Sequence, residues 1–218
     1  HVEGMKEERG HSHEDEEEES HDEEEHFLHS AEETEEEHNE HVHTMDEHVW
    51  TSPGNAIDIV EHITEEFCSL DPEHGQAYKD NAEAYEAQLK ELDTEFRDVV
   101  ENAKNHTLLF GDRFPFRYFA AEYGLDYYAA FSGCASDTEP SAATMAFLIN
   151  KVKEEQIPVV LKMELSNDNI ANAIAEACDV PVKVFYSSHN ISAKQFEAGV
   201  TYLDLMKENV ETLKEALR

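Results

Sequence analysis

The chain has 218 residues and carries 51 acidic against 16 basic side chains, a formal charge of −35 with histidine neutral. Phosphate backbones and anionic lipids repel so acidic a chain, which excludes nucleic acid and membrane surfaces as expected partners. No apolar run approaches the roughly 20 residues of a membrane span, so we expect no direct membrane insertion of this chain. Cations are the ligands that this charge favours.

The charge is concentrated in a low-complexity acidic segment, residues 1–47. This segment holds 21 of the acidic side chains and nine of the 14 histidines but only seven apolar residues, too few for a packed core. Imidazole nitrogens and carboxylate oxygens are ligands that zinc accepts, and a flexible chain wraps them around an ion without a preformed cage. We therefore predict a disordered, metal-collecting segment, with a solvated acidic linker as the alternative. The accessory ligands are His11, His13, His21, His26, His29, His38, His41 and His43.

The first residues of the chain and its three cysteines narrow the class of protein further. His1-Val2-Glu3-Gly4 lacks the basic and apolar regions of a signal peptide and the initiator methionine, which suggests a processed, truncated or excised chain. Cys68, Cys134 and Cys178 are well separated and form no CxxC pair, so they favour neither a thiolate zinc site nor a disulfide scaffold.

Residues 48–106 are predicted to form a helical linker. Ser52-Pro53 is typical of a helix start, and apolar residues then recur at helical spacing as far as Asp71-Pro72. A second helix is expected over residues 76–103, about 40 Å long at 1.5 Å per residue. So long a helix is able to brace a whole domain.

Residues 107–218 alternate between strand and helix patterns, which predicts a carboxy-terminal α/β lobe. Strands are expected at 107–110, 125–131, 159–163 and 182–186, with helices at 116–123, 141–155, 167–178 and 193–217. This alternation indicates right-handed crossovers and a parallel sheet of about four strands flanked by helices. Ligand groups then belong on the loops that follow the strands, beginning at Gly111, Ser132, Glu164 and Ser187.

Four side chains are candidate metal ligands. His189 follows the last predicted strand among small polar residues, and His48 stands where the ordered part of the chain begins. Asp112 either pairs with Arg113 to fix its loop or supplies a metal oxygen, and Glu164 either caps the following helix or ligates. No phosphate-binding glycine loop, GxSxG elbow or HExxH motif is present, so nucleotide enzymes and common hydrolases lose support.

Several segments in order resemble the metal-binding solute-binding proteins of zinc and manganese ABC importers. Residues 46–53, DEHVWTSP, are similar to that family's D-x-H-x-W-x-S-P segment, whose histidine is a metal ligand, and the Glu/His tract before them is similar to the loop of zinc-specific members. Residues 116–125, FRYFAAEYGL, resemble the family's F-x-Y-F-x-x-x-Y-G-L segment. Residues 138–141 and 188–191 fall where the family has a helix start and its last ligand.

The resemblance implies one lobe of a two-lobed binding protein, with a long bracing helix before it. His48 and His189 are then metal ligands, but the family's intervening ligand falls on Arg113, which cannot bind a cation. Asp112 or Glu164 is the expected replacement. The family's amino-terminal lobe, with its own histidine ligand, is not seen in this sequence.

The expected function is therefore that of an extracytoplasmic receptor, periplasmic or a cell-surface lipoprotein, that captures zinc for an ABC permease without catalysis. Imidazole-rich, roughly tetrahedral sites favour zinc over manganese. The alternatives are a metal-dependent hydrolase, which needs a general base beside an open site, and a stand-alone metal buffer acting through the acidic segment.

Overall fold

The structure, a computed structural model, describes residues 46–131 and 140–218. The predicted acidic segment lies outside the described residues except for Asp46 and Glu47, and so do all eight accessory histidines. The predicted boundaries at residues 47 and 106 stay predictions.

The described residues form four strands and seven α-helices, with two short 3₁₀ helices. The strands are β1 (Thr107–Arg113), β2 (Asp126–Phe131), β3 (Val160–Lys162) and β4 (Val182–Val184). The helices are α1 (Pro53–Leu70), α2 (Gly75–Glu101), α3 (Arg117–Tyr123), α4 (Ala142–Glu154), α5 (Asn169–Cys178), α6 (Ala193–Glu197) and α7 (Tyr202–Ala216), and the 3₁₀ helices are η1 (Val49–Thr51) and η2 (Pro72–His74).

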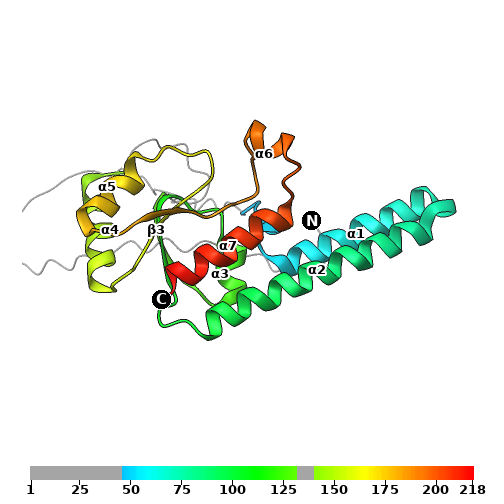
Figure 1. Ribbon diagram of the computed structural model, residues 1–218, viewed down its shortest axis with the longest axis horizontal. Helices are drawn as coiled ribbons and strands as arrows, with labels where there is room; N and C mark the ends of the chain where they lie inside the picture. The colour runs from blue at the N-terminus through cyan, green and yellow to red at the C-terminus, as the bar shows by residue number, and fades with distance from the viewer. Residues whose placement is uncertain (1–45, 132–139) are drawn as a thin grey trace, which may run out of the picture.

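Helices α1 and α2 pack together as an antiparallel hairpin that projects from the α/β body (Figure 1). Helix α1 begins as predicted, because the Ser52 hydroxyl accepts a hydrogen bond from the Asn55 N–H and Pro53 occupies the first helical position. Helix α2 confirms the predicted long helix. Its carboxy-terminal half buries Leu89, Leu92 and Phe96, so the hairpin is fastened to the body at one end.

The four strands form one parallel sheet in the order β2-β1-β3-β4, which confirms the predicted α/β fold. Strand β1 is longer than expected. It runs through Gly111 and Asp112 to Arg113, three residues that were predicted to lie in the following loop. Its register with β2 shifts between Phe110 and Arg113. The pairing with β2 carries the strand past the glycine, so Asp112 is a strand residue.

Helices cover both faces of the sheet, and the side chains of β1 alternate between them. Leu108 and Phe110 belong to a core that includes residues of α2, α3 and α7, whereas Leu109 packs with α4 and α5. This alternation follows from the period of two in a strand. Burial on both faces makes β1 apolar at successive positions, as expected of a central parallel strand.

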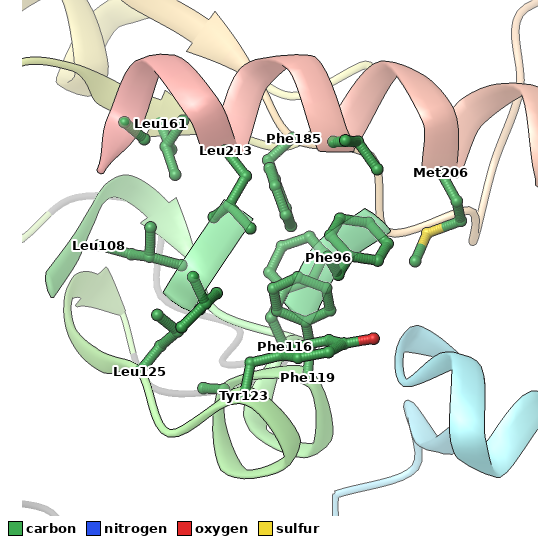
Figure 2. Packing of buried hydrophobic residues seen from close by; sticks show 14 of the residues in the cluster. Phe96, Leu108, Phe116, Phe119, Tyr123, Leu125, Leu161, Phe185, Met206 and Leu213 are labelled. Atoms are coloured by element: carbon green, nitrogen blue, oxygen red, sulfur yellow. The ribbon is translucent and has the colours of Figure 1, made fainter. Parts of the chain in front are cut away.

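An aromatic cluster supports the carboxyl end of β4. Phe185 packs edge-to-face against Phe110, Phe116 and Phe119, with ring centroids 5.0–6.1 Å away. Figure 2 shows Phe185 beside Phe116 and Phe119. All four rings are buried. The cluster therefore holds the backbone immediately before the loop that carries His189.

The carboxy-terminal segment differs from the single helix expected over residues 193–217. It divides into α6 and α7, because Gly199 adopts a left-handed conformation (φ 71°) and Thr201 starts a new helix. The Thr201 side chain accepts from the Asp204 N–H, while the Asp204 carboxylate accepts from the Thr201 N–H. The turn allows α7 to lie along α2 (Figure 1).

Gly111→Ala is expected to destabilise the fold. A Cβ at Gly111 would lie 2.4 Å from the Cα of Ala171 in α5, so α5 would have to move off β1. The loss of unfolding free energy, measured by urea denaturation, should be about 1–3 kcal/mol or more. Gly199→Ala is the control, since it adds only left-handed strain of about 1–2 kcal/mol in open space. Equal stability of Gly111→Ala and the unchanged chain would contradict the close approach of α5.

Candidate metal site

The structure brings the two predicted histidines together. The imidazole centroids of His48, just before η1, and His189, in the loop after β4, lie 5.8 Å apart. The Trp50 ring lies beside both, with centroids 5.4 Å from His48 and 5.9 Å from His189. His48 is buried, with 6% of its surface exposed, and His189 is exposed. Two imidazoles from distant parts of the chain therefore share one site.

Asp46 holds the imidazole of His48. Its Oδ1 lies 2.7 Å from Nδ1 of His48 and also accepts a hydrogen bond from the His48 backbone N–H at 3.0 Å. Burial by itself raises the pKa of Asp46, but the hydrogen bonds from His48 and the charge of Arg117 outweigh it and hold the pKa below its usual value. Asp46 is therefore a carboxylate at neutral pH.

Trp50 joins the His48 segment to the His189 loop. Its indole Nε1–H donates a hydrogen bond of 2.9 Å to the carbonyl oxygen of Ser187. The hydroxyl of Tyr202, at the start of α7, donates a bond of 2.8 Å to the carbonyl oxygen of Trp50. These bonds fasten the segment before α1 to the carboxy-terminal lobe, and they give a physical reason for a tryptophan two residues after the histidine.

Glu164 anchors the loop that carries His189. Its carboxylate accepts hydrogen bonds from the Ser187 hydroxyl (2.6 Å) and from the backbone N–H groups of Ser187 (2.8 Å), His189 (3.3 Å) and Asn190 (3.5 Å). The sequence left helix capping and metal ligation as alternatives for this residue. Helix α5 begins only at Asn169, with Asp168 at its N-cap, so capping does not describe Glu164. The contacts give it the role of loop anchor.

Asp112 ties β1 to the end of β3. It is buried, its Oδ1 accepts from the Arg113 N–H at 2.8 Å and its Oδ2 accepts from the Met163 N–H at 3.0 Å. The guanidinium of Arg113 lies 6.0 Å from the centroid of the Phe131 ring. Both carboxylate oxygens of Asp112 thus accept hydrogen bonds from backbone N–H groups at the carboxyl end of the sheet.

Two of the four predicted ligands therefore share a site, and the two carboxylates make hydrogen bonds within the protein. Across residues 46–131 and 140–218, no group of three or more His, Cys, Asp or Glu side chains is arranged to hold a metal ion. The roles of Asp112 and Glu164 as metal ligands stay predictions. Sequence reasoning missed the function of Asp46 and Trp50, although their spacing of two from His48 was a signal.

The donor set fits zinc. Imidazole nitrogens are ligands that zinc prefers, and a tetrahedral ion held by two of them keeps two positions for other donors. The buried Oδ2 of Asp46 has no hydrogen-bond partner among the described residues, although Nε of Arg117 lies 3.8 Å from it. No helix in the described parts of the chain is long and apolar enough to cross a membrane.

An α/β lobe with a long helical hairpin and two imidazoles beside its sheet is similar to solved solute-binding proteins for metals. The metal-dependent lipoprotein YcdH from Bacillus subtilis is 32% identical, with a TM-score of 0.71 over 80% of this chain and 65% of that one. The Zn(II)-bound ZnuA-like domain of AdcA from Streptococcus pneumoniae is 31% identical, with a TM-score of 0.68 over 79% of this chain and 64% of that domain.

The chain belongs to the ZnuA family, described as zinc-uptake complex component A, periplasmic, whose model matches residues 2–216. Among curated relatives, the high-affinity zinc uptake system protein ZnuA of Bacillus subtilis (strain 168) is 32% identical over 175 residues, which are 80% of this chain and 54% of that protein. The chain thus spans about half the length of this relative.

Glu164→Gln is expected to loosen the His189 loop. One acceptor oxygen becomes an NH₂ group facing N–H donors, which should cost about 1–3 kcal/mol of unfolding free energy. Amide hydrogen exchange at Ser187, His189 and Asn190 should accelerate. Glu215→Gln, which only weakens a surface pair with Lys183, is the control and should leave these amides unchanged. Unaltered exchange in Glu164→Gln would contradict the anchoring role.

Proposed function

We propose that this chain is part of the extracytoplasmic zinc receptor of an ABC metal importer, which captures zinc and passes it to a permease. The observation that carries the proposal is the convergence of His48 and His189, 5.8 Å apart between ring centroids. Membership of the zinc-uptake family supports it, and so do the names of the relatives. Zinc is the cargo of such a receptor.

The ligand chemistry favours zinc over manganese or calcium. Neutral imidazole nitrogen suits zinc, whereas manganese and calcium prefer sites with more oxygen donors. In this proposal His48 and His189 supply two nitrogen ligands, and the remaining positions are filled by donors outside the described residues or by water. Asp112 and Glu164 were the predicted oxygen ligands; their hydrogen bonds within the protein favour a supporting role for both.

The protein's own contribution is to hold the two imidazoles ready. Asp46 fixes the ring of His48, Glu164 fixes the backbone of His189, and the Trp50–Ser187 hydrogen bond joins the two segments. A preorganised pair loses little conformational freedom when an ion binds.

The same contacts favour binding without catalysis. A metal-dependent hydrolase needs a general base within hydrogen-bond reach of a metal-bound water. Among the described residues, the carboxylates shown in contact with His48 and His189 are Asp46 and Glu164, and each is engaged by the protein: one by His48, the other by the loop backbone. Neither is arranged as a base.

The acidic segment is proposed as an accessory collector next to this site. This segment includes Asp46 and is followed directly by His48, so ions that it holds weakly stay at high local concentration near the two imidazoles. A location in the periplasm or on the cell surface, as the family description and the lipoprotein relatives indicate, is part of the same proposal.

His48→Ala and His189→Ala should each weaken zinc binding by about tenfold or more, since even groups that only orient ligands contribute 10–100-fold. Competition of the chain against a chelating dye measures the affinity. His62→Ala, in α1, and His106→Ala, just before β1, are matched controls with no place in the site and should leave the tight affinity unchanged. Wild-type affinity in His189→Ala would refute the assignment of the last ligand.

Deletion of residues 1–44 should remove several weak zinc equivalents and leave the tight one, because the segment contributes many interchangeable histidines. Isothermal titration calorimetry of the shortened and full chains separates the two classes of site. Loss of all tight binding on deletion would instead show that the acidic segment is the zinc-binding part of the chain, as in a metal buffer.

A further inference from the structure

We propose that Asp46 is a positioning residue that fixes the tautomer and the orientation of the His48 ring, so that His48 binds the ion through Nε2. This inference rests on the proposed function, because it concerns how one of the proposed ligands is prepared. It adds a residue to the site that does not itself contact the ion.

The contact between the two side chains determines the tautomer. Oδ1 of Asp46 lies 2.7 Å from Nδ1 of His48. An ionised carboxylate only accepts hydrogen bonds, so in the neutral ring Nδ1 carries the proton and Nε2 carries the lone pair. Because a metal ion binds the unprotonated nitrogen, coordination by His48 runs through Nε2.

The protein holds Asp46 in place from helix α3. The Tyr118 hydroxyl donates a hydrogen bond of 3.0 Å to the carbonyl oxygen of Asp46, and Nε of Arg117 lies 3.8 Å from its Oδ2. The same Oδ1 that contacts the ring also accepts from the His48 backbone N–H. The carboxylate is thus fixed relative to both the backbone and the ring of His48, which leaves the imidazole little freedom to rotate.

The carboxylate of Asp46 is buried beside the guanidinium of Arg117. Its side chain is 4% exposed, and both Oδ2 and the nearby Nε of Arg117 are buried without a hydrogen-bond partner among the described residues. A buried carboxylate with incomplete hydrogen bonding is costly. The positive charge of Arg117 offsets part of this cost, and the carboxylate, through its contact with Nδ1, makes the imidazole of His48 a stronger donor to a metal ion.

A second Asp–His pair, Asp71 and His74, shows that such a contact does not by itself mark a metal site. Nδ1 of His74 lies 2.9 Å from Oδ2 of Asp71, nearly the same geometry, but these side chains are 63% and 44% exposed at the tip of the α1–α2 hairpin. Water competes for such an exposed pair. The Asp71–His74 pair therefore offers a matched control with the same chemistry outside the site.

The first test reads the tautomer directly in the metal-free chain. In ¹⁵N-labelled protein at a pH where His48 is neutral, NMR of the imidazole nitrogens should show a proton on Nδ1 and none on Nε2. In Asp46→Ala the two tautomers should mix. A His48 ring protonated mainly on Nε2 in the unchanged chain would overturn the inference, and it would do so without bearing on whether the chain binds zinc.

The second test measures zinc affinity by competition with a chelating dye. Asp46→Ala should weaken binding by roughly 10–100-fold, with Asp46→Asn in between because its amide oxygen still accepts a hydrogen bond. Asp71→Ala should have no effect. In a His48→Ala background, Asp46→Ala should cause no further loss, because Asp46 acts through His48. A further loss there would assign Asp46 a role other than positioning this ring.

The two tests separate failure of the inference from failure of the proposed function. If His48→Ala and His189→Ala weaken zinc binding but Asp46→Ala does not, the zinc site stands and the positioning role of Asp46 is wrong. If none of the three variants changes zinc affinity while the NMR tautomer is as expected, Asp46 orients a histidine that is no ligand, and the proposed function is wrong together with the part of the inference that concerns zinc.

Discussion

The site depends on the closure of the segment before α1 onto the lobe, in which the indole N–H of Trp50 donates a hydrogen bond to the carbonyl oxygen of Ser187 and the Tyr202 hydroxyl donates one to the carbonyl oxygen of Trp50. The residues on either side of it, His48 and His189, come from segments with no sequence proximity. This closure makes the segment before α1 part of the lobe, and the two imidazoles then share one site.

The sheet supplies the fixed frame for that closure. The buried aromatic rings around Phe185 hold the end of β4 immediately before Ser187, and Asn209 of α7 accepts from the Tyr186 N–H and donates to the Tyr186 carbonyl oxygen. The loop that carries His189 therefore leaves a rigid base. This position agrees with the general rule that ligand groups lie beyond the carboxyl ends of parallel strands.

The acidic residues near the site illustrate why carboxylates are hard to assign from sequence. Asp46, Asp112 and Glu164 are polar groups within or beside the core, and each accepts hydrogen bonds from the protein. Burial of a carboxylate is favourable only when such bonds replace water. In the sequence, a carboxylate that accepts backbone hydrogen bonds at a strand end looks the same as one that binds an ion. Only the contacts in the structure distinguish the two.

The sequence by itself determined the α/β class, the four strands, the long helix and the two histidines, because these follow from local periodicity, helix-start residues and short motifs such as DEHVWTSP. It also predicted β1 too short and α6–α7 as one helix, since strand pairing past Gly111 and the left-handed turn at Gly199 depend on packing. Only the tertiary structure decided that Asp46 holds His48, that Glu164 holds the His189 loop and that Asp112 links β1 to β3. The contacts of Glu164 and Asp112 join residues far apart in the chain, and they depend on which backbone groups the fold leaves without a partner. Asp46 and His48 are only two residues apart, but whether their side chains meet depends on the conformation that the lobe imposes on this segment.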